Sequence, residues 1–493
     1  MITASERSSG GRRGGGWADY AEACSWLAVV VGLLGLGWSV LCTVPGVPWN
    51  AARLAPSFAL ARGLPIYALR ESGAHLGWFY GPVFPLWYLP FAGLENPTVA
   101  FMLAAGWNIV TVLVPVFLVV RAALGGRAGA AARATVVGVV LMLANPVTQS
   151  SFYMLHVDAV CVAGVLAACV ALHAGAVRGW RPGLPLGALA VAWAVGTKQL
   201  AVMVVPATLV WLWREGHGRL LRAWVGWLVA CGGGLAGIFL LSFGAEELLF
   251  NAWFVLARTP WQGGGALLAK SGWDLVQTAW VWWVAGGIGW LVWRPVWRGP
   301  LAPEAGAMVR LLGWAALWQA PFGLVASLKA GGGINSVHAL FYALVAGLIF
   351  VGAALVQADA TRADSRRLRP AVVLGAALLA GLAVDYRMAF MREAVWTPYR
   401  GLENLLARAR ASPGALYLPW NPLITILSDR KIYPFDDALL SLWRAKLEPP
   451  REAIRAAIPA GAVIFYQEPS QSHFALNYFG PEARAAAEPK REP

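Results

Sequence analysis

Three ionisable residues of this chain lie in or beside long apolar runs, where a charge is costly and commonly marks a functional site. His156 and Asp158 stand at the start of one apolar run, and Lys198 separates two shorter ones. A carboxylate can accept a proton as a general base, and a lysine can hold a phosphate as a point charge. These residue types predict a polar site at the edge of an apolar protein.

Each candidate also has an ordinary structural interpretation. Asp158 could cap the helix that it begins, because carboxylates favour helix N-termini. Lys198 could extend its ammonium group to the membrane surface. Glu71 shares the segment 45–97 with one other acid, Glu95, and could be a solvated loop charge. Residue type alone leaves both interpretations open.

The histidines raise the question of a metal ion. His75, His156 and His338 could gather with Asp158 or Glu71 around a divalent metal. No ligand spacing supports such a site, and satisfied histidines at the membrane interface explain the residues more simply. We therefore predict no cofactor, and a divalent metal stays an open alternative.

The elements that must position these residues are membrane spans. The chain has 493 residues, of which 58% are hydrophobic and 13% charged. Apolar runs of roughly 20 residues recur from residue 24 to residue 390, with many of the Trp residues at their ends. The net charge of +14 reflects Arg residues in short loops, which orient a membrane protein. Membrane lipids are the expected partners of these charges, and nucleic acid is rejected.

Arginine placement predicts the topology, because cytoplasmic loops are enriched in Lys and Arg. Placing the Arg-rich loops inside gives about eleven spans, a cytoplasmic N-terminus and an outer C-terminus. Residues 1–23 then form a disordered cytoplasmic tail, and residues 24–390 form the membrane domain of a multi-pass inner-membrane protein. The first outer loop, 45–97, is long. Most ionisable candidates fall on the outer side, so we expect an extracytoplasmic site.

One apolar stretch in the first outer loop, 78–94, is interrupted by three prolines. It is too short to cross about 30 Å of hydrocarbon, and proline removes backbone hydrogen-bond donors. We interpret it as an interfacial or re-entrant segment on the outer face.

Residues 391–493 differ in composition and predict a small soluble α/β domain outside the cytoplasm. Strand-like runs at 414–419 and 462–466 flank helical patterns at 437–447 and 450–458. The five Cys residues all lie upstream, in or beside apolar runs, so no disulfide is expected in this domain.

The order and placement of several short strings resemble the GT-C superfamily of membrane glycosyltransferases, which use sugars linked to polyprenyl phosphates. The strings are 49–57 (WNAARLAPS), 61–67 (ARGLPIY), 80–85 (YGPVFP), 156–159 (HVDA), 197–199 (TKQ) and 333–335 (GIN). The resemblance covers most of the chain and is mannosyltransferase-like. It implies transfer of a hexose or pentose from a polyprenyl-phosphate donor to a glycan, lipid or protein outside the cytoplasm.

The resemblance also implies roles for individual residues. Lys198 would bind the lipid phosphate, assisted by Arg53 or Arg62. The other residues expected to bind substrate are Tyr80, His156, Gln199, Asn335 and His338.

The general base is the point of departure from the family pattern. Similar proteins usually carry an acid early in the first outer loop, where this chain has Asn50 and no Asp within 45–97. An amide cannot usefully accept a proton, so Asp158 or Glu71 is predicted to take the role. Asp158 is preferred because a helix fixes its position.

Two other functions are kept as alternatives. A transporter or lipid flippase would account for the many spans, the broken helix pair and the intramembrane Lys198. The long outer loop and the outer domain argue against it. A non-catalytic relative that binds a polyprenyl lipid would account for Asn50.

Overall fold

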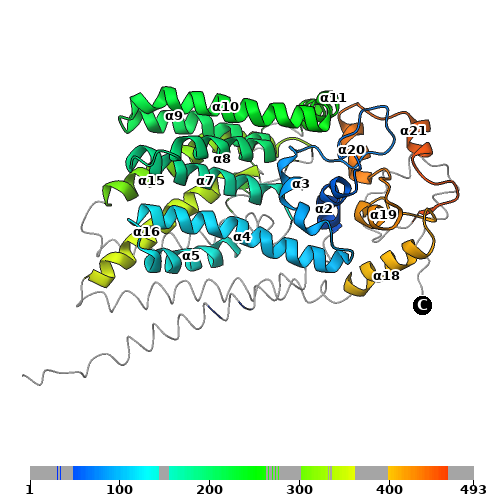
Figure 1. Ribbon diagram of the computed structural model, residues 1–493, viewed down its shortest axis with the longest axis horizontal. Coiled ribbons are helices and arrows are strands. Elements are labelled where there is room, and N and C mark those ends of the chain that lie inside the picture. The colour runs from blue at the N-terminus through cyan, green and yellow to red at the C-terminus, as the bar shows by residue number, and fades with distance from the viewer. Residues whose placement is uncertain are drawn as a thin grey trace, which may run out of the picture.

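The structure is a computed structural model of the whole chain (Figure 1). It describes residues 48–143, 155–261, 301–330, 336–360 and 398–464, and single positions at 30, 34, 265, 269, 272, 273, 276 and 332. The predicted cytoplasmic tail and nearly all of the predicted first, eighth and eleventh spans lie outside these residues. The count of about eleven spans therefore stays a prediction.

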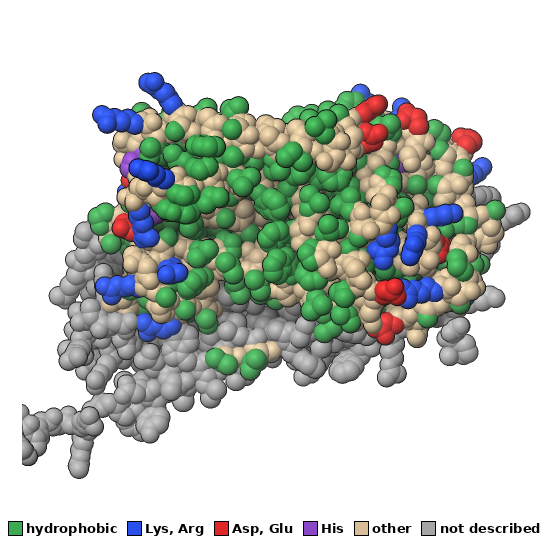
Figure 2. All heavy atoms as spheres, viewed as in Figure 1, with side chains coloured by type: hydrophobic (Ala, Val, Ile, Leu, Met, Phe, Trp, Pro, Cys, Tyr) green, Lys and Arg blue, Asp and Glu red, His purple; other side chains and the backbone are tan. Residues whose placement is uncertain are grey.

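The long helices lie side by side along one axis of the molecule (Figure 1). They are α4 (Pro97–Ala123), α5 (Ala128–Leu143), α7 (Val157–Val177), α8 (Gly183–Thr197), α9 (Val204–Arg214), α10 (Gly218–Phe243), α15 (Pro303–Ser327) and α16 (Ala339–Ala360). Three helices in the described part of the chain, α4, α7 and α10, are long and apolar enough to cross a membrane. Hydrophobic side chains cover the visible middle of the bundle, and charged ones gather at its ends (Figure 2). This distribution is that of an integral membrane protein.

The helices begin where local chemistry favours it. The Asn96 side chain accepts hydrogen bonds from the backbone N–H groups of Thr98 and Val99, and Pro97 occupies the first helical position of α4. The apolar residues Leu103 and Val114 of this helix are exposed on the surface of the bundle. The sequence of α4 therefore both starts the helix and supplies a face suited to lipid.

Ion pairs bring several Arg-rich loops to one end of the bundle. Arg178 donates to the carbonyl oxygen of Ala122 at 2.6 Å and pairs with Glu304 at 2.5 Å. Arg310 pairs with Glu215 at 2.5 Å. These contacts join the ends of α4, α7 and α9 to the start of α15, as the predicted inner side requires. Which membrane face this end occupies stays a prediction.

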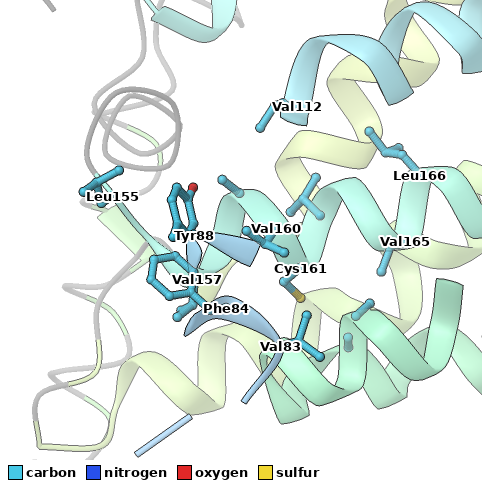
Figure 3. Close-up of a cluster of buried hydrophobic side chains, with 14 of the residues drawn as sticks. Val83, Phe84, Tyr88, Val112, Leu155, Val157, Val160, Cys161, Val165 and Leu166 are labelled. Carbon is cyan, nitrogen blue, oxygen red and sulfur yellow. The ribbon is translucent and has the colours of Figure 1, made fainter. Parts of the chain in front are cut away.

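The proline-rich stretch 78–94 folds as two short helices, α3 (Val83–Trp87) and η2 (Leu89–Phe91). Val83 and Phe84 are fully buried and pack with Val157 at the start of α7 (Figure 3). The structure confirms that this stretch forms no membrane-spanning helix. It instead packs at the end of the bundle that carries the C-terminal segment, and its position on the outer face stays a prediction.

The C-terminal segment lies at the opposite end from the Arg-rich loops (Figure 1). Its elements are α18 (Pro398–Ala411), β1 (Leu416–Tyr417), α19 (Pro422–Asp429), α20 (Asp436–Arg444), α21 (Arg451–Ala456) and β2 (Val463–Ile464). The strands β1 and β2 pair in parallel, with Leu416 opposite Val463. Both strands and the helices α20 and α21 lie within or beside the predicted runs.

This segment is joined closely to the first outer loop, of which α2 (Pro48–Ala61) is the first element. The backbone N–H of Phe435 donates to the carbonyl oxygen of His75 at 2.9 Å. Leu402 and Leu423 belong to the same buried cluster as the bundle helices. The segment therefore shares its core with the membrane domain.

Candidate active site

The site is built around the start of α7. His156 is the N-cap residue of this helix, and its side chain accepts a hydrogen bond from the backbone N–H of Asp158 at 3.3 Å. Asp158 lies in the first turn and is completely buried. The capping group is therefore the histidine, and the carboxylate of Asp158 is turned to other partners.

The first of these partners is Lys198. This residue interrupts the helical pair between α8 and η3 (Gln199–Met203), in an extended backbone conformation. Its Nζ lies 2.6 Å from Oδ1 of Asp158 and 3.3 Å from Oγ of Ser336. Only 8% of Lys198 is exposed, so the alternative in which its ammonium group reaches the membrane surface is wrong.

Two of the three predicted histidines complete the cluster. Nε2 of His338 lies 2.6 Å from Oδ1 of Asp158, and Nδ1 of His156 contacts Oδ2. His75 lies elsewhere, buried in the first outer loop. Within the described part of the chain, no group of three or more His, Cys, Asp or Glu side chains is arranged to hold a metal ion. The ammonium group of Lys198 supplies the positive charge at this carboxylate.

These contacts decide what Asp158 can do in this conformation. Both of its carboxylate oxygens face charged or polar partners, and none of its surface is exposed. A general base must come within hydrogen-bond reach of the hydroxyl that it activates. In this conformation the carboxylate is held by Lys198, His338 and His156, and the role of Asp158 as general base stays a prediction. A buried carboxylate of this kind needs such partners to offset its desolvation.

The helix α2 covers the cluster through two contacts to one residue. Oδ1 of Asn50 accepts a hydrogen bond from the backbone N–H of Leu155 at 3.0 Å. Nη1 of Arg53 donates to the carbonyl oxygen of Leu155 at 3.2 Å. Because Leu155 immediately precedes His156, this clamp positions the start of α7. A structural role for Asn50 was not predicted from the sequence.

Arg53 brings a second cation to the edge of the cluster. It interacts electrostatically with Tyr80, Asp158 and Asp437, and these interactions oppose the lowering of its pKa by burial. Arg53 at Leu155 and Lys198 at Asp158 thus place two cations at the start of α7, beside the half-buried Tyr80 of the first loop. Two such cations are suited to an anionic group such as a phosphate.

The remaining predicted residues make contacts of other kinds. Nη1 of Arg62 donates to the carbonyl oxygens of Phe58 and Ala92, each at 3.2 Å, so it ties the end of α2 to the proline-rich stretch 78–94. Nε2 of Gln199 donates to the carbonyl oxygen of Ala252 at 2.6 Å.

Glu71 is exposed and makes no hydrogen bond or ion pair with the residues that the structure describes. Its position fits the alternative of a solvated loop charge. Asn335 lies outside the described residues.

Two residues of interest were not predicted from the sequence. Ser336 contacts Lys198, and Asp437 interacts electrostatically with Arg53 and Arg444. Asp437 lies in the first turn of α20, at the start of a predicted helical pattern. A carboxylate that begins a helix is usually explained by the helix alone, so no local signal marked it.

Comparisons with known proteins found no matching family model and no matching curated protein. Two solved structures are similar: ArnT from Cupriavidus metallidurans bound to undecaprenyl phosphate, and the same protein in its apo state. Each has 14% sequence identity, over 87% of this chain and 89% of that chain, with TM-scores of 0.49 and 0.48. We therefore base the functional proposal on the residues of this chain.

Proposed function

We propose that this protein is a GT-C-like glycosyltransferase, which moves a sugar from a polyprenyl-phosphate donor to an acceptor outside the cytoplasm. One observation carries the proposal. Both Arg53 and Lys198 reach the start of α7, because Arg53 donates to the carbonyl oxygen of Leu155 at 3.2 Å and Nζ of Lys198 lies 2.6 Å from Oδ1 of Asp158. A lipid phosphate in the outer leaflet would meet two cations there.

The chemistry requires stabilisation of a departing phosphate. As the bond between the sugar C1 and the phosphate oxygen breaks, negative charge develops on the leaving group, and positioned cations stabilise it. Arg53 can hold phosphate oxygens through its planar guanidinium, and Lys198 acts as a point charge. Lys198 would share its ammonium group between the donor phosphate and Asp158.

Asp158 then acts as a positioning residue in this conformation. Its carboxylate stabilises the charged form of Lys198 and directs the ammonium group from a helix terminus. It could serve as a base only after Lys198 and His338 have moved away. Glu71, the other predicted base, is exposed on the loop.

Transfer assays test the proposal directly. The purified protein is offered a panel of polyprenyl-phosphate sugars, and both donor binding and sugar transfer are measured. We expect transfer from at least one donor, loss of donor binding in Lys198→Ala, and partial retention in Lys198→Arg. Arg408→Ala is the matched control, because this cation is exposed on α18.

Two outcomes would contradict the proposal. If Lys198→Ala and Lys198→Arg both bind the donor as wild type does, Lys198 is no phosphate ligand. If the protein transfers no sugar but moves polyprenyl phosphates across liposome membranes, the transporter or flippase alternative replaces the transferase.

A further inference from the structure

We infer that Asp437 is the carboxylate that accepts the proton of the acceptor hydroxyl, and that the acceptor binds at the solvent-exposed edge of the seam between α2 and α20, beside Trp49 and Trp420. The inference deepens the proposed function and rests on it. It assigns a residue of the C-terminal segment to the step for which the first outer loop supplies no aspartate.

The seam is a direct contact between the first outer loop and the C-terminal segment. Ala52 of α2 and Phe79 share a buried cluster with Phe435 and Ala438, which flank Asp437. The approach is close, because a Cβ added at Gly77 would lie 2.8 Å from Cβ of Ala438. The beginning of α20 is therefore held against the loop that covers the polar cluster.

Aromatic side chains line the same seam. The ring of Trp49 in α2 lies edge-on to that of Trp420, with 5.5 Å between the ring centroids. Trp420 in turn lies 5.9 Å from Phe435. Trp49 is 39% exposed and Trp420 is half-buried, so part of this aromatic surface is open to solvent. Apolar rings with a few convergent polar groups are typical of sites for organic ligands.

Arg53 links the seam to the candidate phosphate site. Its guanidinium lies 6.0 Å from the ring of Trp49, and it interacts electrostatically with both Asp158 and Asp437. One cation is therefore coupled electrostatically to both the buried cluster and the carboxylate of the seam. We place the donor phosphate at Arg53 and the acceptor hydroxyl at Asp437.

Asp437 has the properties that the other two acids lack. Asp158 is fully buried among charged partners, and Glu71 is exposed on a loop. Asp437 is half-buried, and it makes no hydrogen bond or direct ion pair with the described residues. Burial raises its pKa, while Arg444 and Arg53 lower it. A carboxylate with a raised pKa is a stronger base for a hydroxyl proton near neutral pH.

In the proposed step, sugar transfer and proton transfer to Asp437 occur together. The acceptor oxygen attacks C1 of the sugar and forms the new C–O bond, while its proton passes to the carboxylate of Asp437. The electron pair of the bond between C1 and the phosphate oxygen leaves with the phosphate. The products are the glycosylated acceptor and polyprenyl phosphate, and Asp437 later releases its proton to water.

The test compares Asp437→Asn, Asp437→Glu and Glu452→Gln, using the donor that wild type turns over and octyl glycosides as acceptor probes. Glu452 is the matched control, since it is an exposed acid in the first turn of α21. Asp437→Asn should lower kcat by roughly 10²–10⁴-fold, with donor affinity and thermal stability unchanged. Asp437→Glu should recover part of the rate, because it restores the carboxylate.

The two possible failures are distinguishable. If Asp437→Asn keeps the wild-type rate while Lys198→Ala loses it, the inference is overturned and the proposed function stands. If Asp437→Asn loses stability or donor affinity in proportion to its rate, Asp437 is structural and the inference is again overturned. If wild type neither binds nor turns over any donor of the panel, the proposed function fails and the inference fails with it.

Discussion

Lys198 and Asp158 form a buried ion pair. Removing either charge alone should lower the free energy of unfolding strongly, whereas removing both should lower it much less. The ammonium nitrogen lies 2.6 Å from Oδ1 of a carboxylate that is completely buried. At an effective dielectric constant of about 20, two unit charges at that distance attract by about 6 kcal/mol. Desolvation costs several kcal/mol per ion, so the intact pair contributes little net stability.

Removing one partner has a different effect, because an uncompensated charge stays buried. We expect Lys198→Met or Asp158→Asn to lower the free energy of unfolding by about 3–5 kcal/mol. The double variant Asp158→Asn/Lys198→Met should be less destabilised than the sum of the single variants. His338 contacts the same oxygen and could compensate Lys198→Met by binding a proton. The comparison is therefore made at about pH 8, where histidine is ordinarily neutral.

The measurement is unfolding in mixed detergent micelles titrated with SDS. Arg410→Met is the control, because Arg410 pairs with Glu95 at 3.3 Å and their side chains are 41% and 78% exposed. Exposed pairs of this kind contribute roughly 0–1 kcal/mol. If Lys198→Met costs no more than the control, or if the double variant costs the full sum, the two charges are not paired in the folded protein.

Three further predictions concern the end of the bundle that carries the C-terminal segment. Burial lowers the pKa of His75 from 6.5 to about 4. The unfolded chain therefore binds this proton first, and stability should fall by about 3 kcal/mol as the pH drops from 6.5 to 4, a loss that is absent in His75→Leu. Gly81→Ala places a Cβ 1.9 Å from a carbonyl oxygen of α8 and should lower the free energy of unfolding by about 1–3 kcal/mol. Gly93→Ala is the control and should lower it less, because a Cβ there meets nothing within 4 Å. Asn50→Ala leaves the Leu155 amide without this acceptor and should cost about 1–3 kcal/mol; an unchanged unfolding midpoint would contradict the clamp.

Features that depend only on residues close together in the sequence were predictable from it. Hydropathy identified α4 and α7, because a membrane-spanning helix needs a continuous apolar run. The polar interruption at Lys198 and the prolines of 78–94 marked a helix break and a stretch of short helices, since each acts on the local backbone. The same holds for the positions of the two strands and of α20 and α21 in the C-terminal segment.

The pairing of charges was decided by the tertiary structure. Asp158 meets a lysine 40 residues away and a histidine 180 residues away. Nothing in the local sequence of α7 specifies either contact, because each depends on how α8 and the residues before α16 pack against it. The sequence did place Asp158, Lys198, His156 and His338 among its candidates, since an ionisable group in an apolar run is conspicuous.

The position of Asp437 at the seam was even less predictable from the sequence. A carboxylate in the first turn of an amphipathic helix has a sufficient local explanation, so composition and spacing assign it no other role. Only the packing of Phe435 and Ala438 against Ala52 and Phe79 brings it to the helix that carries Arg53. Membrane spans, helix breaks and helix caps depend on interactions between residues that are close together in the sequence. The partners of a buried charge depend on long-range packing, which local periodicity does not encode.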